Sequence, residues 1–168
     1  MNLRERPRIG VMGPSECSPR IWNLAMDVGQ AIAREGGILI CGGGGGVMEA
    51  AAKGAKAKGG ITVGILPGER ADQANPYIDI PVVTALGNAR NVVNVLTSQV
   101  IIAIHGAYGT LSEIALALKC GTPVVGLETW TVSPPSGEAS PPIPNAAGAE
   151  EAVAMALNLV RASSRIGH

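Results

Sequence analysis

Short apolar runs alternate with helix-like segments along this chain, and this alternation limits the possible folds more than any other feature. The expected strands cover residues 8–13, 38–41, 62–66, 78–83, 100–104 and 123–127. The expected helices cover residues 20–35, 47–58, 88–98, 110–120 and 150–162. Such alternation predicts right-handed βαβ units, so we expect an α/β fold with a single doubly wound parallel sheet flanked by helices. Ligands of such sheets bind at the carboxyl ends of the strands.

The composition agrees with a sheet that is covered on both faces. Hydrophobic residues make up 46% of the chain but aromatic residues only 2%, so the core must be aliphatic, as parallel sheets buried on both faces require. A length of 168 residues fits one domain, and we expect residues 1–168 to form it. Within it, a Pro-rich connector at about 128–148 precedes a C-terminal helix at about 150–162. The connector is expected to be a surface loop, with a lid over the site as the alternative.

Charge and cysteine content exclude several classes of protein. Thirteen basic and thirteen acidic residues balance, so nucleic acid is not an expected partner. Cys17, Cys41 and Cys120 lie far apart in the sequence, which predicts buried thiols in a reducing compartment and no protein-bound metal. The N-terminus is charged, and no apolar run approaches the ~18 residues of a membrane span. We therefore expect a cytoplasmic protein that does not bind membranes.

Two Gly-rich loops follow strands and lead into helices. In the first, residues 101–113, the free N–H groups of a helix expected to start near Thr110 would form an anion site, with Glu113 one turn inside. In the second, the five glycines of 42–46 would let the backbone approach a ligand closely. Neither loop is a Walker A or a GxGxxG dinucleotide motif, so NAD is not expected. Ser15, after the first strand, either reaches a phosphate or only stabilises a turn.

Three side chains near these loops remain open to more than one role. With Asn88 as an N-cap, Arg90 falls in the first helical turn, where it opposes the helix dipole by roughly 0.3–1 kcal/mol. A bound anion or the Glu113 carboxylate would explain this, and so would a solvated surface arginine. Thr110 and Glu113 also match a capping box, so Glu113 is a helix cap, a ligand contact or a catalyst. His105 either packs or contacts the ligand.

The expected helix 110–120 is apolar nearly all round, which indicates burial on two sides. One side can face the sheet, and the other requires a second layer. In so short a chain that layer is expected to be another subunit, giving a homodimer or a tetramer. The apolar residues of this helix are Leu111, Ile114, Ala115, Leu116, Ala117, Leu118 and Cys120.

Together these segments resemble the LOG-like Rossmann superfamily, which includes cytokinin phosphoribohydrolases and proteins labelled lysine decarboxylases. Its hallmark PGGxGTxxE is matched over residues 105–113, with departures at His105 and Ala107. Arg90 fits the family's catalytic arginine, but Asn91 replaces the lysine that follows it.

The resemblance is closer to the branch of molybdenum cofactor carrier proteins, and it extends over roughly residues 8–127. The similar segments are 9–14, 45–48, 53–55, 64–68, 79–84 and 113–119. The resemblance implies a phosphate-accommodating surface at the two Gly-rich loops, which would suit molybdenum cofactor, a pterin monophosphate.

Two functions follow from the resemblance. The first is binding and protection of a phosphorylated pterin, most simply molybdenum cofactor, by a carrier that is not an enzyme. The alternative is hydrolysis of the N-glycosidic bond of a nucleoside 5′-monophosphate, with Arg90 and Glu113 catalytic. Carriers keep both residues, so these two side chains do not decide between the functions. The expected ligand-binding residues are Gly13, Ser15, Gly42, Gly43, Gly44, Gly45, Gly46, Val47, Met48, Arg90, His105, Gly106, Ala107, Tyr108, Gly109, Thr110 and Glu113.

Overall fold

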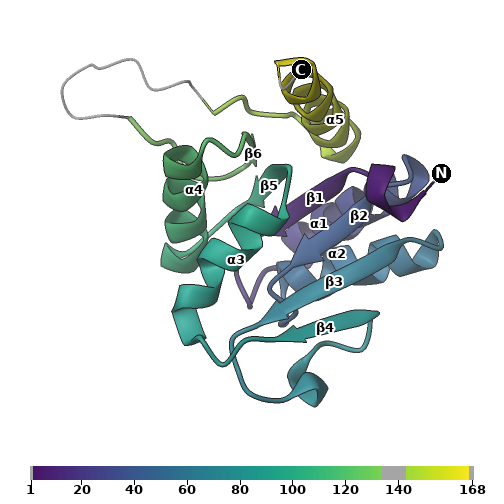
Figure 1. Ribbon diagram of the computed structural model, residues 1–168, viewed down its shortest axis with the longest axis vertical. Coiled ribbons are helices and arrows are strands. Elements are labelled where there is room, and N and C mark those ends of the chain that lie inside the picture. Colours follow the sequence, from purple (N-terminus) through teal and green to yellow (C-terminus); the bar gives the residue numbers. More distant parts are fainter. Residues whose placement is uncertain (1, 134–142, 167–168) are drawn as a thin grey trace.

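Six parallel strands form one sheet in the order β4-β3-β2-β1-β5-β6 (Figure 1). The computed structural model describes residues 2–133 and 143–166. Its strands are β1 (Arg8–Met12), β2 (Ile38–Cys41), β3 (Ile61–Leu66), β4 (Ile80–Val83), β5 (Val100–Ile104) and β6 (Val124–Leu127). The predicted doubly wound α/β fold is therefore confirmed. Residues 134–142, the middle of the connector predicted at 128–148, lie outside the described residues.

Helices cover both faces of this sheet. They are α1 (Pro19–Arg34), α2 (Val47–Ala57), α3 (Arg90–Thr97), α4 (Tyr108–Cys120) and α5 (Ala149–Ile166). Helices α1, α2 and α5 pack on one face, and α3 and α4 pack on the other (Figure 1). Short 3₁₀ turns occur at Leu3–Glu5, Ala71–Gln73 and Gly87–Ala89. Within the described ranges, no helix combines the length and apolarity that crossing a bilayer requires.

The central strands are buried on both faces, which explains why they are continuous apolar runs in the sequence. In β5, Ile102 and Ile104 belong to the core under α1, α2 and α5. Ile101 and Ala103, which alternate with them, belong to the core under α3 and α4. All five residues of β5 are buried, so this strand joins the two apolar layers.

The chain reverses direction across the sheet at β1. Strands β2, β3 and β4 are added outward on one side of β1, and the chain then returns to place β5 on the other side. The loops that leave β1 and β5 therefore run to opposite faces of the sheet and separate. Such a switch point, at the carboxyl ends of the strands, is where open α/β sheets bind ligands.

Candidate functional site

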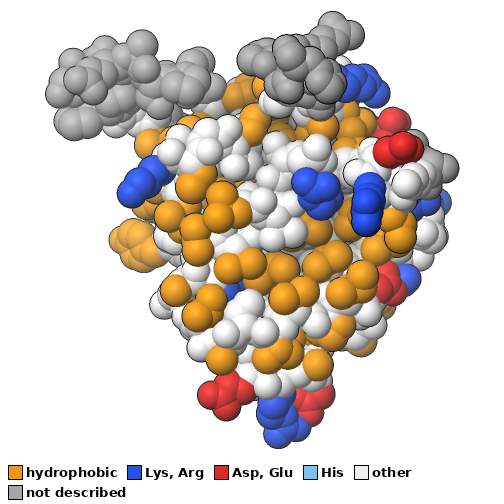
Figure 2. Space-filling view, in the orientation of Figure 1, with side chains coloured by type: hydrophobic (Ala, Val, Ile, Leu, Met, Phe, Trp, Pro, Cys, Tyr) orange, Lys and Arg blue, Asp and Glu red, His pale blue; other side chains and the backbone are white. Residues whose placement is uncertain are grey.

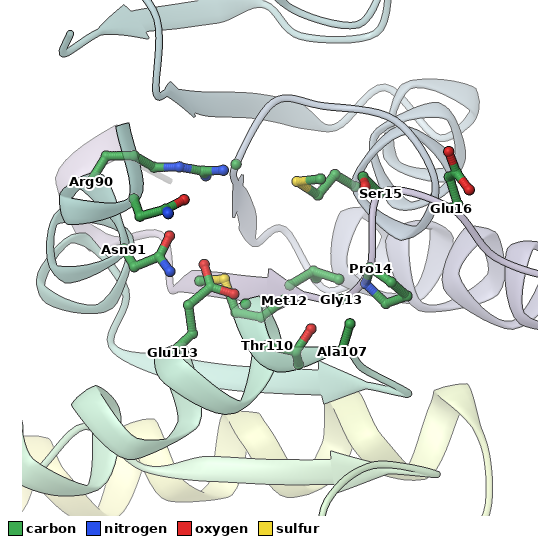
Figure 3. Close-up of a pocket in the computed structure, with 15 residues that line it drawn as sticks. Met12, Gly13, Pro14, Ser15, Glu16, Arg90, Asn91, Ala107, Thr110 and Glu113 are labelled. Carbon is green, nitrogen blue, oxygen red and sulfur yellow. The ribbon is translucent and has the colours of Figure 1, made fainter. Parts of the chain in front are cut away.

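A cavity of about 360 Å³ lies at this switch point, at the carboxyl ends of β1, β2 and β5 (Figure 3). Its size falls within the range of small-molecule sites. The chain segments that line it come from the loop after β1, the loop after β2, the start of α3 and the start of α4. The lining residues are Val11, Met12, Gly13, Pro14, Ser15, Glu16, Gly42, Met48, Asn88, Arg90, Asn91, Ala107, Gly109, Thr110 and Glu113.

Three helices begin at this cavity without a side-chain cap. The N-cap residues of α2, α3 and α4 are Gly46, Ala89 and Ala107, and none of them caps its helix through a side chain. Helix α1, in contrast, is capped by Ser18, whose hydroxyl accepts a hydrogen bond from the N–H of Ile21. Uncapped helix starts leave N–H donors and a positive dipole end for other partners. The helix starts at the cavity are therefore suited to an anion.

The capping-box interpretation of Glu113 is wrong. Helix α4 starts at Tyr108, two residues earlier than predicted, so Glu113 lies in its second turn and cannot reach the N-cap. The Glu113 Oε1 atom instead accepts a hydrogen bond of 2.9 Å from Nδ2 of Asn94 on α3. The hydroxyl of Thr110, the supposed cap, is buried and has no hydrogen-bond partner among the described residues.

Arg90 is the first residue of α3, but Asn88 is not its N-cap. Gly87–Ala89 form a 3₁₀ turn that leads directly into the helix. The Arg90 guanidinium then lies against Gly42, where an added Cβ would be only 2.0 Å from Nη1. The Nε and Nη1 atoms of Arg90 are buried and have no hydrogen-bond partner in the described part of the chain.

Arg90 and Glu113 both face the cavity (Figure 3), but no ion pair within 4.0 Å joins them. Burial lowers the pKa of Arg90, although the negative charge of Glu113 opposes this shift. Burial likewise raises the pKa of Glu113 against the effects of the Asn94 hydrogen bond and the Arg90 charge. For both groups, loss of hydration outweighs their mutual attraction. Because no ion pair joins Arg90 to Glu113, both side chains are available to a ligand.

The cavity brings together about half of the residues predicted to contact a ligand. Those on its wall are Gly13, Ser15, Gly42, Met48, Arg90, Ala107, Gly109, Thr110 and Glu113. Those outside the wall are Gly43, Gly44, Gly45, Gly46, Val47, His105, Gly106 and Tyr108.

The residues outside the wall have other surroundings. Val47 is fully buried, and the Tyr108 side chain is 81% exposed and lies beside the Trp130 ring. His105 is exposed and has a φ of 53°, so it turns the chain after β5. Gly43 and Gly46 also have positive φ angles, which glycine adopts without steric cost. Gly43 and Gly46 therefore allow the backbone to turn between β2 and α2.

Several residues on the wall were not predicted. Val11, Met12, Pro14 and Glu16 join the wall because the end of β1 and its loop form one side of the cavity. Asn91 follows Arg90 directly, and Asn94 lies one helical turn further on, behind Glu113. The spacing of these polar residues within an otherwise apolar helix is a signal that could have identified this face of α3.

Known proteins are similar to this chain in sequence. A family model of the SLOG cluster4 family matches residues 6–157. An uncharacterized protein of Archaeoglobus fulgidus is 50% identical over 121 residues, covering 72% of this chain and 80% of the relative.

Solved structures are similar over nearly the whole chain. The molybdenum cofactor binding protein from the phototrophic bacterium Rippkaea orientalis has a TM-score of 0.83 and 39% identity, covering 93% of this chain and 98% of that chain. The molybdenum cofactor carrier protein from Chlamydomonas reinhardtii has a TM-score of 0.81 and 39% identity, covering 93% of this chain and 99% of that chain.

Proposed function

Because this chain belongs to the SLOG cluster4 family, we propose that it binds molybdenum cofactor as a carrier or storage protein. The family and structural matches confirm the resemblance to the LOG-like superfamily and to its molybdenum cofactor carrier branch. Two similar structures, each 39% identical, are named for binding or carrying this cofactor.

The observation that carries the proposal is a set of buried polar atoms without partners at the cavity. They are Nε and Nη1 of Arg90 and Oγ1 of Thr110. Leaving a buried polar group unpaired costs about 1–3 kcal/mol, and more for a charged group. A phosphate oxygen would pair with these donors and with the uncapped starts of α2, α3 and α4. The cavity therefore fits the phosphate end of a pterin monophosphate.

The rest of the cavity offers surface for the other end of the ligand. Met12 and Met48 place thioether side chains on the wall, and thioethers make favourable contacts with flat rings. Gly42 presents no side chain where Arg90 lies, which leaves room for the guanidinium on the cavity wall at the end of β2.

The test is binding of isolated molybdenum cofactor, measured by the fluorescence of the pterin that remains with the protein after gel filtration. We expect saturable binding at one cofactor per chain. Arg90→Met should weaken it at least about tenfold, since a charge-assisted hydrogen bond contributes about 1.5–3 kcal/mol. Arg70→Met, which changes an exposed arginine outside the cavity wall, is the matched control. Equal binding by Arg90→Met and wild type would contradict the proposal.

Hydrolysis of a nucleoside 5′-monophosphate is the second candidate. One observation favours it: the buried carboxyl of Glu113 faces the same cavity as Arg90, and burial raises its pKa, as in many acid–base catalysts. Incubation with a panel of nucleoside monophosphates tests it through release of free base. Release that disappears in Glu113→Gln would establish an enzyme. No release, together with saturable cofactor binding, would leave the carrier function alone.

A further inference from the structure

The two oxygens of the Glu113 carboxyl group have different surroundings. The residue is only 7% exposed, and its Oε1 accepts the hydrogen bond from Asn94 Nδ2. Among the described residues, Oε2 has no hydrogen-bond partner. The carboxyl end of this side chain points into the cavity (Figure 3), so the unpartnered oxygen is available to a ligand.

Asn94 is placed to hold one oxygen of Glu113 and nothing else. Its side chain is fully buried on α3, and within the described structure its only side-chain hydrogen bond is the one to Glu113. Its Oδ1 atom is buried without a partner, which is costly. A leucine at position 94 would be of similar size and would avoid the cost of the unpaired Oδ1. The presence of asparagine therefore indicates that its hydrogen bond to Glu113 has a function.

Few charges face Glu113 from the surrounding elements. Arg90 on α3 is the nearest cation, and Cys41 at the end of β2 is a buried thiol whose pKa burial raises to about 11, so it stays neutral. Glu16, in the loop after β1, lies on the opposite wall, and His105 follows β5 outside the wall. A bound dianion would pair with Arg90 and add negative charge next to the carboxyl, which disfavours an ionised Glu113.

We propose that Asn94 is a positioning residue that keeps Oε1 of Glu113 occupied, so that a tetrahedral oxyanion binds in the cavity together with one proton on Oε2. The proton comes from a hydronium ion or a buffer acid in the solvent, whose own bond to that proton breaks as the Oε2–H bond forms. The resulting O–H donates a hydrogen bond to an oxygen of the anion. Asn94 Nδ2 donates to Oε1 in both protonation states, which directs the proton to the oxygen that faces the cavity. This inference rests on the proposed function, because it assumes that the cavity binds the phosphate end of a ligand.

The experiment measures binding of inorganic sulfate, which remains a dianion throughout the neutral range and adds no protons of its own. Calorimetry of the wild-type protein in two buffers with different ionisation enthalpies gives the number of protons taken up. The midpoint is the pH at which Glu113 is half ionised in the protein without sulfate. Above this midpoint we expect uptake of close to one proton per sulfate bound, and the affinity for sulfate should fall by up to about tenfold for each pH unit.

Variants distinguish the role of Glu113 from the role of Asn94. Glu113→Gln keeps a neutral side chain of the same shape, so it should bind sulfate without proton uptake and with an affinity independent of pH. Asn94→Leu removes the donor to the carboxylate, so the midpoint of the pH dependence should move to higher pH. Asn91→Leu is the matched control, because Asn91 also joins α3 to α4, donating to Ser112 Oγ at 3.0 Å, but among the described residues its side chain makes no hydrogen bond to a titratable group. It should leave the midpoint unchanged even if the affinity changes.

Each failure has a distinct meaning. Sulfate binding without proton uptake, or uptake that persists in Glu113→Gln, would overturn this inference and leave the proposed anion site intact. A midpoint that is the same in Asn94→Leu and wild type would remove the role of Asn94. Absence of saturable binding of sulfate and of inorganic phosphate at every pH would instead overturn the proposed function. The measurement on the wild-type protein alone decides the proton uptake even if a variant does not fold.

Discussion

At the scale of single residues, Gly42 and Arg90 form one unit of the site. The Arg90 guanidinium occupies the space that a side chain at position 42 would need, and Met48 Sδ lies only 2.7 Å from the same added Cβ. The neighbours that would clash are therefore the far ends of flexible side chains. A larger residue at this position would change where the cation lies more than it would change the fold.

Gly42→Ala should consequently weaken binding of a phosphorylated ligand by about tenfold or more, because displaced charge-assisted hydrogen bonds contribute about 1.5–3 kcal/mol. The thermal midpoint should change little. Ligand titration and thermal unfolding of the same samples check both expectations. Gly44→Ala is the matched control, since its added Cβ would meet only the end of the Met48 side chain, at 3.0 Å. Unchanged affinity in Gly42→Ala would contradict the placement of Arg90.

Glu113 makes the stability of the empty protein depend on pH. Burial raises its pKa above the ordinary value for glutamate, so the folded protein binds this proton more tightly than the unfolded chain does. The contribution of this group is therefore fully favourable below about 4.5 and is lost as the pH rises through the folded-state pKa. At neutral pH an ionised Glu113 destabilises the fold.

Glu113→Gln should therefore stabilise the protein at neutral pH by roughly 0.5–2 kcal/mol, as removal of a destabilising functional group often does. The gain should shrink as the pH falls toward the ordinary value for glutamate. Denaturant unfolding at several pH values measures it, with the exposed Glu69→Gln as control. A variant that is less stable than wild type at neutral pH would show that the Arg90 charge, not burial, dominates.

At the scale of elements, α1 and α2 pack closely because glycines remove side chains from their contact. An added Cβ at Gly29 would lie 1.9 Å from the carbonyl oxygen of Ala51, and one at Gly54 would lie 2.0 Å from that of Met26. These clashes involve backbone atoms, which cannot move aside without shifting a helix. This close contact fixes α2, whose start borders the cavity, against α1.

Gly54→Ala should destabilise the protein by about 1–3 kcal/mol through overpacking, although alanine normally favours a helix over glycine by about 1 kcal/mol. The sign of the effect is thus the informative result. Gly109→Ala is the comparison, since it is also helical but has no atom within 4 Å of its added Cβ, and it should be neutral or stabilising. Equal effects of the two substitutions in denaturant unfolding would contradict the close packing of α1 and α2.

The burial of each strand and the capping of each helix explain which elements could be predicted from the sequence. Strand positions were predicted to within about two residues, because a strand buried on both faces leaves a clear apolar run. Helix starts were predicted to within one residue except at α3 and α4, where the error is two residues because Asn88 and Thr110 look like caps but do not cap. Cap rules describe a helix whose first N–H groups are paired by the side chain of its N-cap, whereas α3 continues a 3₁₀ turn and α4 follows Ala107, which has no capping side chain. Local rules fail most often at functional sites.

Prediction of the site was limited for a related reason. The run 42–46 is glycine-rich in part because Gly43 and Gly46 need positive φ angles, and this requirement depends on how the loop meets its neighbours. Asn94 was missed because its hydrogen bond to Glu113 joins two helices whose packing is not encoded in either segment alone. Arg90 was identified because a cation at a helix start contradicts the dipole, a signal that is visible in the sequence itself.

At the scale of the whole molecule, both apolar layers share one sheet, so we propose that residues 1–168 form a single domain.

One face of the molecule remains rich in apolar side chains. Figure 2 shows hydrophobic side chains extending over the region of α3, α4 and β4. On α4, Ala115 is exposed and Leu116 is half-buried, so this helix is incompletely covered in the described chain. The large exposed apolar residues on β4, the loop after it and α3 are Ile80, Val82, Val83, Leu86 and Leu96.

Exposed apolar surface of this extent is typical of an interface, and a second copy of the chain would cover it symmetrically. The predicted homodimer or tetramer is therefore expected to assemble through α3 and β4, and Leu96, at 66% exposure, is the most accessible apolar side chain there. Leu96→Glu should shift the mass measured by light scattering to a smaller species, because a buried charge without a partner opposes association. Leu3→Glu, at an apolar side chain exposed to 57% in a different part of the molecule, is the matched control and should leave the mass unchanged. A wild-type protein that is monomeric at micromolar concentration, or a Leu96→Glu variant with the wild-type mass, would exclude this surface as the interface.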